Sequence, residues 1–300
     1  MVRHLSMQLG FLLKHAMLIA VLGVASVTAA QAERLQVVAS FSILGDMTRV
    51  VAGDAADVAV IVGPNADAHT YSPSVTDART VAGADLILVN GLGFETWSQT
   101  LIETSGTKAP LVVATDGIAA LTVEGEPDPH AWNSFKNASI YVDNIAKALS
   151  AADADNAATY RANASAYRAE LKTLASEVEA IFASLPADRR TVVTAHDAFG
   201  YLEEAYGLRF LAPLGISDEA EPSAQELAAL IEQLRQEKVA ALFVENIKSP
   251  ALVQQISRET GIELGGRLFS DALSREGPAQ TYLGMMRHNA RSIAAALTRQ

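Results

Sequence analysis

Short apolar runs alternate with amphipathic stretches along the first half of the chain. The runs are rich in Val, Ile and Leu without polar alternation, which is typical of parallel strands covered on both faces. The stretches between them show helical spacing of their apolar residues. Strands are therefore predicted at Leu35–Ser40, Val58–Val62, Leu86–Asn90 and Leu111–Ala114, and helices at Ile43–Val51, Ser74–Ala82, Glu95–Glu103 and Asn137–Leu149.

The second half shows the same alternation without repeating the sequence itself. Strands are predicted at Thr191–Ala195, Arg209–Ala212, Ala241–Glu245 and Arg267–Phe269, and helices at Ala198–Tyr206, Ser223–Glu237, Ser249–Thr260 and Tyr282–Leu297. This pattern predicts an α/β protein with two lobes. Each lobe is expected to hold a four-stranded, mainly parallel sheet flanked by helices.

The longest helical stretch, Asp153–Leu185, separates the two halves. It contains no Gly or Pro, Asp153 or Asp155 can cap its start, and Pro186 marks its end. About 30 residues at ~1.5 Å rise span roughly 45 Å. A coiled-coil arm is the alternative, but no second heptad segment is present to pair with it. We interpret the stretch as a rigid linker helix joining the lobes. Its apolar face is predicted to comprise Tyr160, Ala164, Tyr167, Leu171, Leu174, Val178, Ile181 and Leu185.

Residues 1–32 have the pattern of a secretory signal peptide. Basic residues precede an apolar run, Ala16–Val27, that is too short to span a membrane comfortably, and Ala30–Ala32 fits an A-x-A cleavage site. The chain has no cysteine, so neither a lipid anchor at the cleavage site nor a disulfide is expected. We expect a periplasmic protein with an N-terminal lobe at 33–152, a linker helix at 153–186 and a C-terminal lobe at 187–300.

The composition is acidic, with 34 Asp and Glu against 23 Lys and Arg and a formal net charge of −11. This balance argues against nucleic acid and anionic membrane surfaces as partners. It is compatible with a cation as the ligand. We expect a monomer that binds no nucleic acid.

Histidine is scarce after residue 32, where only four remain. His69, His130 and His196 all lie in loops that follow predicted strands, and ligands of open α/β sheets bind at the carboxyl ends of strands. A single loop histidine usually lies at the surface or forms a hydrogen bond. Three in equivalent places instead favour a metal site, because imidazole is the commonest metal ligand among side chains. The fourth, His288 on the last helix, is interpreted as solvated surface.

Asp271 follows the last predicted strand and completes a candidate donor set. Two lobes facing each other across a cleft would bring His69 and His130 from one side towards His196 and Asp271 from the other. Three imidazoles and one carboxylate suit Zn²⁺, with bonds of ~2.0–2.2 Å.

Three further side chains are predicted near this cleft. Glu245, at the end of a strand, is either the hydrogen-bond partner of a ligand histidine or a rim carboxylate bonded to backbone. Trp97 and Trp132 are expected to pack beside the cleft.

A secreted zinc hydrolase is the main alternative from another class. A catalytic zinc needs an open coordination position and a nearby general base. No H-E-x-x-H motif occurs, and Asp271 would fill the fourth position. An adhesin that binds metal incidentally is a second alternative, but nothing in the sequence predicts a large exposed apolar patch. We therefore expect a binding protein and not an enzyme.

Four segments resemble the signatures of the metal-binding substrate-binding proteins of ABC importers, in the group with a rigid linker helix that serves zinc, manganese or iron uptake. They recur in the family's order and span essentially all of residues 33–300. The resemblance implies two lobes with the metal between them, and delivery of that metal to an inner-membrane ABC permease driven by its ATPase. The segments are Gly63–Ser74, Asp128–Trp132, Thr194–Asp197 and Ser270–Asp271.

Carried over residue by residue, the resemblance implies metal ligation by His69, His130, His196 and Asp271. Manganese and iron members commonly have Glu where this chain has His196, so a third imidazole favours Zn²⁺, with Mn²⁺ or iron as the alternative.

The chain departs from the family pattern in two places. Many zinc members carry a long His-rich loop before the second ligand, where this chain has the short Glu124–Glu126, which leaves open loading by a periplasmic metallochaperone. In family members an Asp-Pro pair often follows the residue equivalent to Trp132, and this chain has Asn133–Lys136 there instead.

Overall fold

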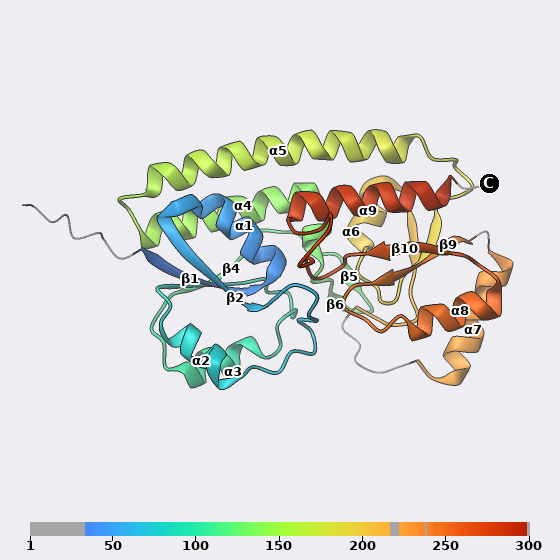
Figure 1. Cartoon of the computed structure of the whole chain (residues 1–300), viewed down its shortest axis with the longest axis horizontal. Helices are drawn as coiled ribbons and strands as arrows, with labels where there is room; N and C mark the ends of the chain where they lie inside the picture. The colour runs from blue at the N-terminus through green and yellow to red at the C-terminus, as the bar shows by residue number, and fades with distance from the viewer. Residues whose placement is uncertain (1–33, 217–221, 238, 299–300) are drawn as a thin grey trace, which may run out of the picture. The chain divides into compact units, whose positions relative to one another are not determined.

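The computed structural model describes residues 34–216, 222–237 and 239–298. The predicted signal peptide, residues 1–32, lies outside the described residues. Two four-stranded sheets with helices around them confirm the predicted fold class (Figure 1). In the described part of the chain, no helix combines the length and apolar character needed to cross a membrane.

The first sheet has the strand order β2-β1-β3-β4, and every neighbouring pair is parallel. Its strands are β1 Leu35–Phe41, β2 Ala56–Val62, β3 Leu86–Val89 and β4 Leu111–Val113. Its helices are α1 Ser42–Ala52, α2 Val75–Ala82, α3 Ser98–Ser105 and α4 Phe135–Ala152. Helix α2 starts one residue later than predicted, because Ser74 forms a capping box with Asp77 and so lies just outside the helix.

The second sheet has the order β10-β9-β7-β8 and is also parallel throughout. Its strands are β7 Thr191–Val193, β8 Arg209–Leu211, β9 Val239–Glu245 and β10 Leu264–Leu268. Its helices are α6 Gly200–Tyr206, α7 Ala224–Gln236, α8 Ala251–Thr260 and α9 Tyr282–Leu297.

The two sheets share one connectivity. In each, the first strand lies between the second and the third, and the fourth strand lies beyond the third. The chain therefore reverses its winding direction beside β1 in one lobe and beside β7 in the other. Loops that leave the carboxyl ends of strands at such a point diverge and create a binding crevice.

A short hairpin that was not predicted separates β4 from His130. It consists of β5 Thr122–Val123 and β6 Glu126–Pro127, paired antiparallel. Its turn residues, Glu124 and Gly125, have φ of 53° and 93°, as a type I′ turn requires. His130 was predicted in the loop after the fourth strand, and this hairpin lies within that connection.

The linker helix is α5, Ala157–Ala183, which is shorter at both ends than predicted. The predicted cap Asp153 instead ends α4, and its side chain accepts hydrogen bonds from Asn156 and the Tyr160 hydroxyl. The buried stripe ends at Phe182, whereas Ile181 is only half-buried. An α-helix of 3.6 residues per turn drifts away from a strict 3.5 repeat, which moves the last contact by one residue.

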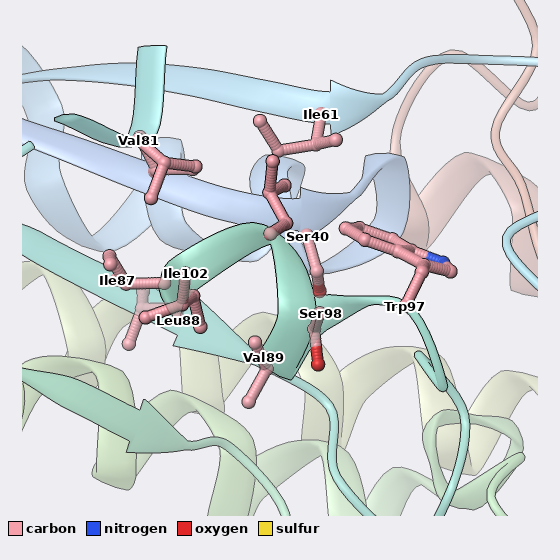
Figure 2. A pocket seen from close by; sticks show the side chains of 11 residues that line it. Ser40, Ile61, Val81, Ile87, Leu88, Val89, Trp97, Ser98 and Ile102 are labelled. Carbon is pink, nitrogen blue, oxygen red and sulfur yellow. The ribbon is translucent and has the colours of Figure 1, made fainter. Parts of the chain in front are cut away.

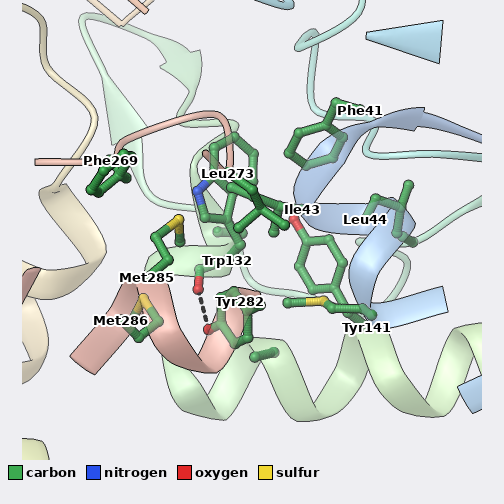
Figure 3. Packing of buried hydrophobic residues seen from close by; sticks show 14 of the residues in the cluster. Phe41, Ile43, Leu44, Trp132, Tyr141, Phe269, Leu273, Tyr282, Met285 and Met286 are labelled. Atoms are coloured by element: carbon green, nitrogen blue, oxygen red, sulfur yellow. Dashed lines mark hydrogen bonds between the residues drawn. The ribbon is translucent and has the colours of Figure 1, made fainter. Parts of the chain in front are cut away.

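Helix α5 runs beside α1 and α4 of the first lobe and beside α9 of the second (Figure 1). A continuous hydrophobic cluster extends through both lobes and α5. Figure 3 shows Trp132 and Phe41 from the first lobe packed near Leu273 and Tyr282 from the second. The Tyr282 hydroxyl donates to the Trp132 carbonyl at 2.6 Å. This packing holds together the loops that carry the site.

Candidate metal centre

His69 lies in the loop between β2 and α2. The carboxylate of Asp67 accepts the His69 backbone N–H at 2.9 Å, which forms a local turn. Trp97 Nε1–H donates to the Ala68 carbonyl at 2.8 Å, and the Phe94 ring meets the imidazole edge to face at 4.6 Å. These contacts hold the His69 ring in one orientation.

His130 lies just before a single 3₁₀ turn, Ala131–Asn133. Asp128 Oδ1 lies 2.7 Å from His130 Nδ1 and also accepts the His130 backbone N–H at 2.9 Å. A carboxylate on Nδ1 keeps the proton there and leaves Nε2 free to bind a metal. Trp132 Nε1–H donates to the Ser270 carbonyl at 2.9 Å, which ties this loop to the second lobe.

His196 comes from the loop after β7, and Glu245 from the end of the neighbouring strand β9. Glu245 Oε1 accepts the backbone N–H groups of Ala195 and His196 at 2.8 and 3.0 Å. Its Oε2 accepts from the Ser270 hydroxyl at 2.6 Å. Oε2 also lies 2.6 Å from His196 Nδ1. Glu245 thus combines the two roles that the sequence left open, contacting both the ring and the backbone.

The free nitrogens of the three imidazoles converge on Asp271. His69 Nε2 lies 3.3 Å from His130 Nε2 and 3.3 Å from Asp271 Oδ2. His196 Nε2 lies 3.0 Å from Asp271 Oδ2, and His130 Nε2 lies 3.6 Å from Asp271 Oδ1. One donor atom from each residue lies within 4.8 Å of the others. Four donors around a zinc ion with bonds of ~2.0–2.1 Å would be about 3.3 Å apart, so the spacing suits such an ion.

All four side chains are buried, with 6% of His69, 1% of His196 and none of His130 or Asp271 exposed. Asp271 Oδ1 has no hydrogen-bond partner in the structure. A buried carboxylate oxygen without a partner costs free energy that a cation would recover. The donor set therefore fits a metal ion.

The buried carboxylates control the charge on the imidazoles. Burial alone would lower the pKa of His196, but Glu245 and Asp271 outweigh it and raise that pKa well above 6.5. Burial alone would raise the pKa of Asp271, but His196 and His130 hold it well below its usual value. Burial lowers the pKa of His69, against the opposing effect of Asp271. Glu245 and Asp271 therefore favour the protonated form of His196, while His196 and His130 favour the ionised form of Asp271.

The structure brings His69, His130, His196 and Asp271 together, as the sequence predicted, and places Trp97 and Trp132 beside two of them. His288, which was interpreted as solvated surface, is only partly exposed. It is half-buried, its Nε2 lies 3.1 Å from the Arg267 carbonyl, and its ring packs on Phe269. It is not part of the donor set.

Asp128 is the site residue that the sequence analysis missed. A signal for it was present, because His69 and His130 both follow an aspartate by two positions. An aspartate at that spacing can accept the histidine N–H and fix the turn. At His130 the same carboxylate also reaches the ring, which the spacing alone does not reveal.

An apolar pocket in the first lobe is separate from this cluster (Figure 2). Apart from two serines its lining is apolar or aromatic, so it offers no imidazole, carboxylate or thiolate to a metal. The residues lining it are Val38, Ser40, Ile61, Val81, Ile87, Leu88, Val89, Trp97, Ser98, Leu101 and Ile102.

Two parallel α/β lobes that enclose one buried donor set are the architecture of substrate-binding proteins, here with a metal ion as the cargo. A family model described as "Zinc-uptake complex component A periplasmic" (ZnuA) matches residues 37–296. The chain belongs to this family of metal-binding substrate-binding proteins of ABC importers, which work outside the cytoplasm. The family implies a permease and an ATPase as partners, and it is a transport family and not one of hydrolases.

Named relatives differ in their metal. The chain is 36% identical over 269 residues to the iron-binding protein YfeA of Yersinia pestis, which covers 88% of this chain and 86% of the relative. It is 34% identical over 283 residues to the manganese ABC transporter substrate-binding lipoprotein PsaA of Streptococcus mitis, covering 90% and 92%. The periplasmic zinc-binding protein TroA of Treponema pallidum has a similar structure, with a TM-score of 0.85 at 31% identity, covering 89% of this chain and all of TroA.

These comparisons establish metal binding for the family, but the relatives are named for different metals. The metal of this chain has to be inferred from its own donor atoms. PsaA is named a lipoprotein, whereas the chain described here has no cysteine. The expectation of a protein without a lipid anchor stays a prediction, as do the signal peptide, the lobe boundaries, the monomeric state and loading by a metallochaperone.

Proposed function

We propose that this chain is the zinc-binding component of its importer. It binds one Zn²⁺ through Nε2 of His69, His130 and His196 and a carboxylate oxygen of Asp271, and releases the ion to the membrane permease. The observation that carries the proposal is the convergence of three imidazoles and one carboxylate, all buried and with one donor atom of each within 4.8 Å of the others.

Zinc is favoured over manganese by the balance of donors. Imidazole suits Zn²⁺, whereas carboxylate and water oxygens suit Mn²⁺. The alternative is a manganese protein, because several relatives carry manganese in their names. Metal analysis of protein purified without added metal tests the choice directly. One equivalent of zinc supports the proposal, and manganese in its place would refute it.

His196→Glu is expected to shift selectivity towards Mn²⁺ by about tenfold relative to Zn²⁺, or ~1.4 kcal/mol. The change replaces a nitrogen donor with a harder, charged oxygen donor. Zn²⁺ should still bind the variant more tightly than Mn²⁺ does, because the intrinsic affinity of Zn²⁺ for such sites is higher. Competition titrations of both metals against a chelator measure the ratio. A ratio equal to that of the wild type would show that His196 is not a ligand.

Zn²⁺ affinity is expected to rise as the pH rises through neutrality, because fewer protons then compete with the metal for the imidazoles. The metal must displace the proton on His196, whose pKa is raised well above 6.5, so that proton still competes above neutrality. His69 has a lowered pKa and is protonated only at more acidic pH, where a second proton should steepen the dependence. Chelator competition at pH 6, 7 and 8 checks both slopes. A constant affinity from pH 7 to 8 would contradict the raised pKa of His196.

A further inference from the structure

An ion pair crosses between the lobes beside the candidate metal centre. Lys248, three residues after the end of β9, donates through Nζ to Asp67 Oδ2 at 2.6 Å. Both side chains are largely buried, with 14% and 12% exposed. The other oxygen of Asp67 accepts the His69 backbone N–H at 2.9 Å. One carboxylate therefore connects a lysine of the second lobe to a candidate ligand of the first.

A second bridge lies next to this pair. Asn246 Nδ2 donates to Asn65 Oδ1 at 3.1 Å and to the Ala272 carbonyl at 3.0 Å. The Asn65 backbone N–H donates to the Leu273 carbonyl at 2.9 Å. Asn246 directly follows Glu245, and Ala272 directly follows Asp271. The loops that carry the candidate ligands of the two lobes are thus bonded to each other at this edge of the site.

Burial of the donor set makes these bridges relevant to metal release. An ion held by side chains that are at most 6% exposed has no direct path to water, so the loops around it must separate before it leaves. His69 is the most exposed of the four. On the other side, His130 is fixed by the buried contacts of Trp132 with Ser270 and Tyr282. Displacement of the loop that carries His69 would open the site without breaking these contacts of Trp132.

We propose that Lys248 is a positioning residue that slows metal release. Through Asp67 it holds the His69 loop closed over the ion without touching the ion itself. The inference rests on the proposed function, because it needs a metal bound at the four candidate ligands. Beyond the proposed function, the inference assigns to Lys248 an effect on the residence time of the bound ion.

The test compares zinc release from the full-length wild type, Lys248→Met and Asp67→Asn. Methionine has a similar length and no donor, whereas asparagine keeps an acceptor for the His69 N–H and removes the charge. Each variant should release zinc about fivefold faster in stopped-flow mixing with excess chelator, the upper end of the effect expected for losing one ion pair that still has 14% and 12% of its side chains exposed. The double variant should match the single variants, because both remove one interaction. Lys248→Arg should release zinc at close to the wild-type rate.

Arg168→Met is the matched control, since it removes an ion pair with Asp143 that lies on exposed helix surface away from the site. Its release rate should equal that of the wild type. Thermal unfolding of each metal-free variant separates a release effect from a loss of fold stability. Normal zinc binding with a release rate for Lys248→Met within twofold of the wild type would overturn this inference alone. Failure of the wild type to bind zinc would overturn the proposed function and this inference with it.

Discussion

Asp271→Asn is expected to weaken Zn²⁺ binding by about a hundredfold, or ~2.7 kcal/mol. Asp271 supplies the negative charge of the donor set, and its carboxylate contacts all three imidazoles. Asparagine has the same shape but no charge, so it retains the packing and provides a poorer ligand. Isothermal titration with a competing chelator measures the affinity.

The control for this experiment is His288→Ala. It removes the remaining described imidazole, which contacts the Arg267 carbonyl and Ser292 and not the donor set. Its zinc affinity should equal that of the wild type. If Asp271→Asn bound zinc normally, or if His288→Ala lost binding tenfold, the ion would have to lie elsewhere.

Trp132→Ala is expected to lower the free energy of unfolding of the metal-free protein by about 3–5 kcal/mol. The side chain is fully buried and packs against Phe41 and Phe94 with ring centroids 5.0 and 4.9 Å apart. Truncation leaves a cavity and also removes the hydrogen bond from Nε1 to the Ser270 carbonyl. Urea denaturation followed by circular dichroism measures the change.

Trp97→Ala provides the comparison, because Trp97 is half-buried and makes one analogous hydrogen bond to the Ala68 carbonyl. It should lose clearly less stability than Trp132→Ala. Equal losses would mean that the packing of Trp132 between the lobes contributes little. If the free energy of unfolding falls with urea concentration at the same slope in both variants as in the wild type, each variant still unfolds from a native-like structure.

The hydrophobic pattern predicted the main helices because each is long enough to show a helical period, and the main strands because each lies in a short run of apolar residues. The β5–β6 hairpin escaped prediction since two-residue strands such as Thr122–Val123 carry no period at all. Helix α3 begins at Ser98 and not at Glu95. Glu95 is buried and accepts the backbone N–H groups of Asn90 and Gly91, so its side chain closes a loop before the helix starts.

The candidate ligands were predictable because histidine is scarce and strand ends are recognisable from sequence. The contacts that hold these ligands in place were less predictable. Glu245 could be proposed from its place at a strand end, but its simultaneous contact with His196 and with backbone depends on how β7 and β9 pair. Lys248 and Asp67 are 181 positions apart, and no local pattern connects them. Only the packing of the lobes brings this pair together.

The equal division of donors between the lobes has a consequence for mechanical integrity. Each lobe supplies two of the four candidate ligands, so neither alone could complete the four-ligand set. In a chain without cysteine, a zinc ion bound there would serve as a removable cross-link between distant segments, comparable to a disulfide that opens without reduction. Zinc binding would link the two halves. The free energy of unfolding would then rise with the logarithm of the free zinc concentration. Unloading at the permease would return the chain to its uncross-linked form.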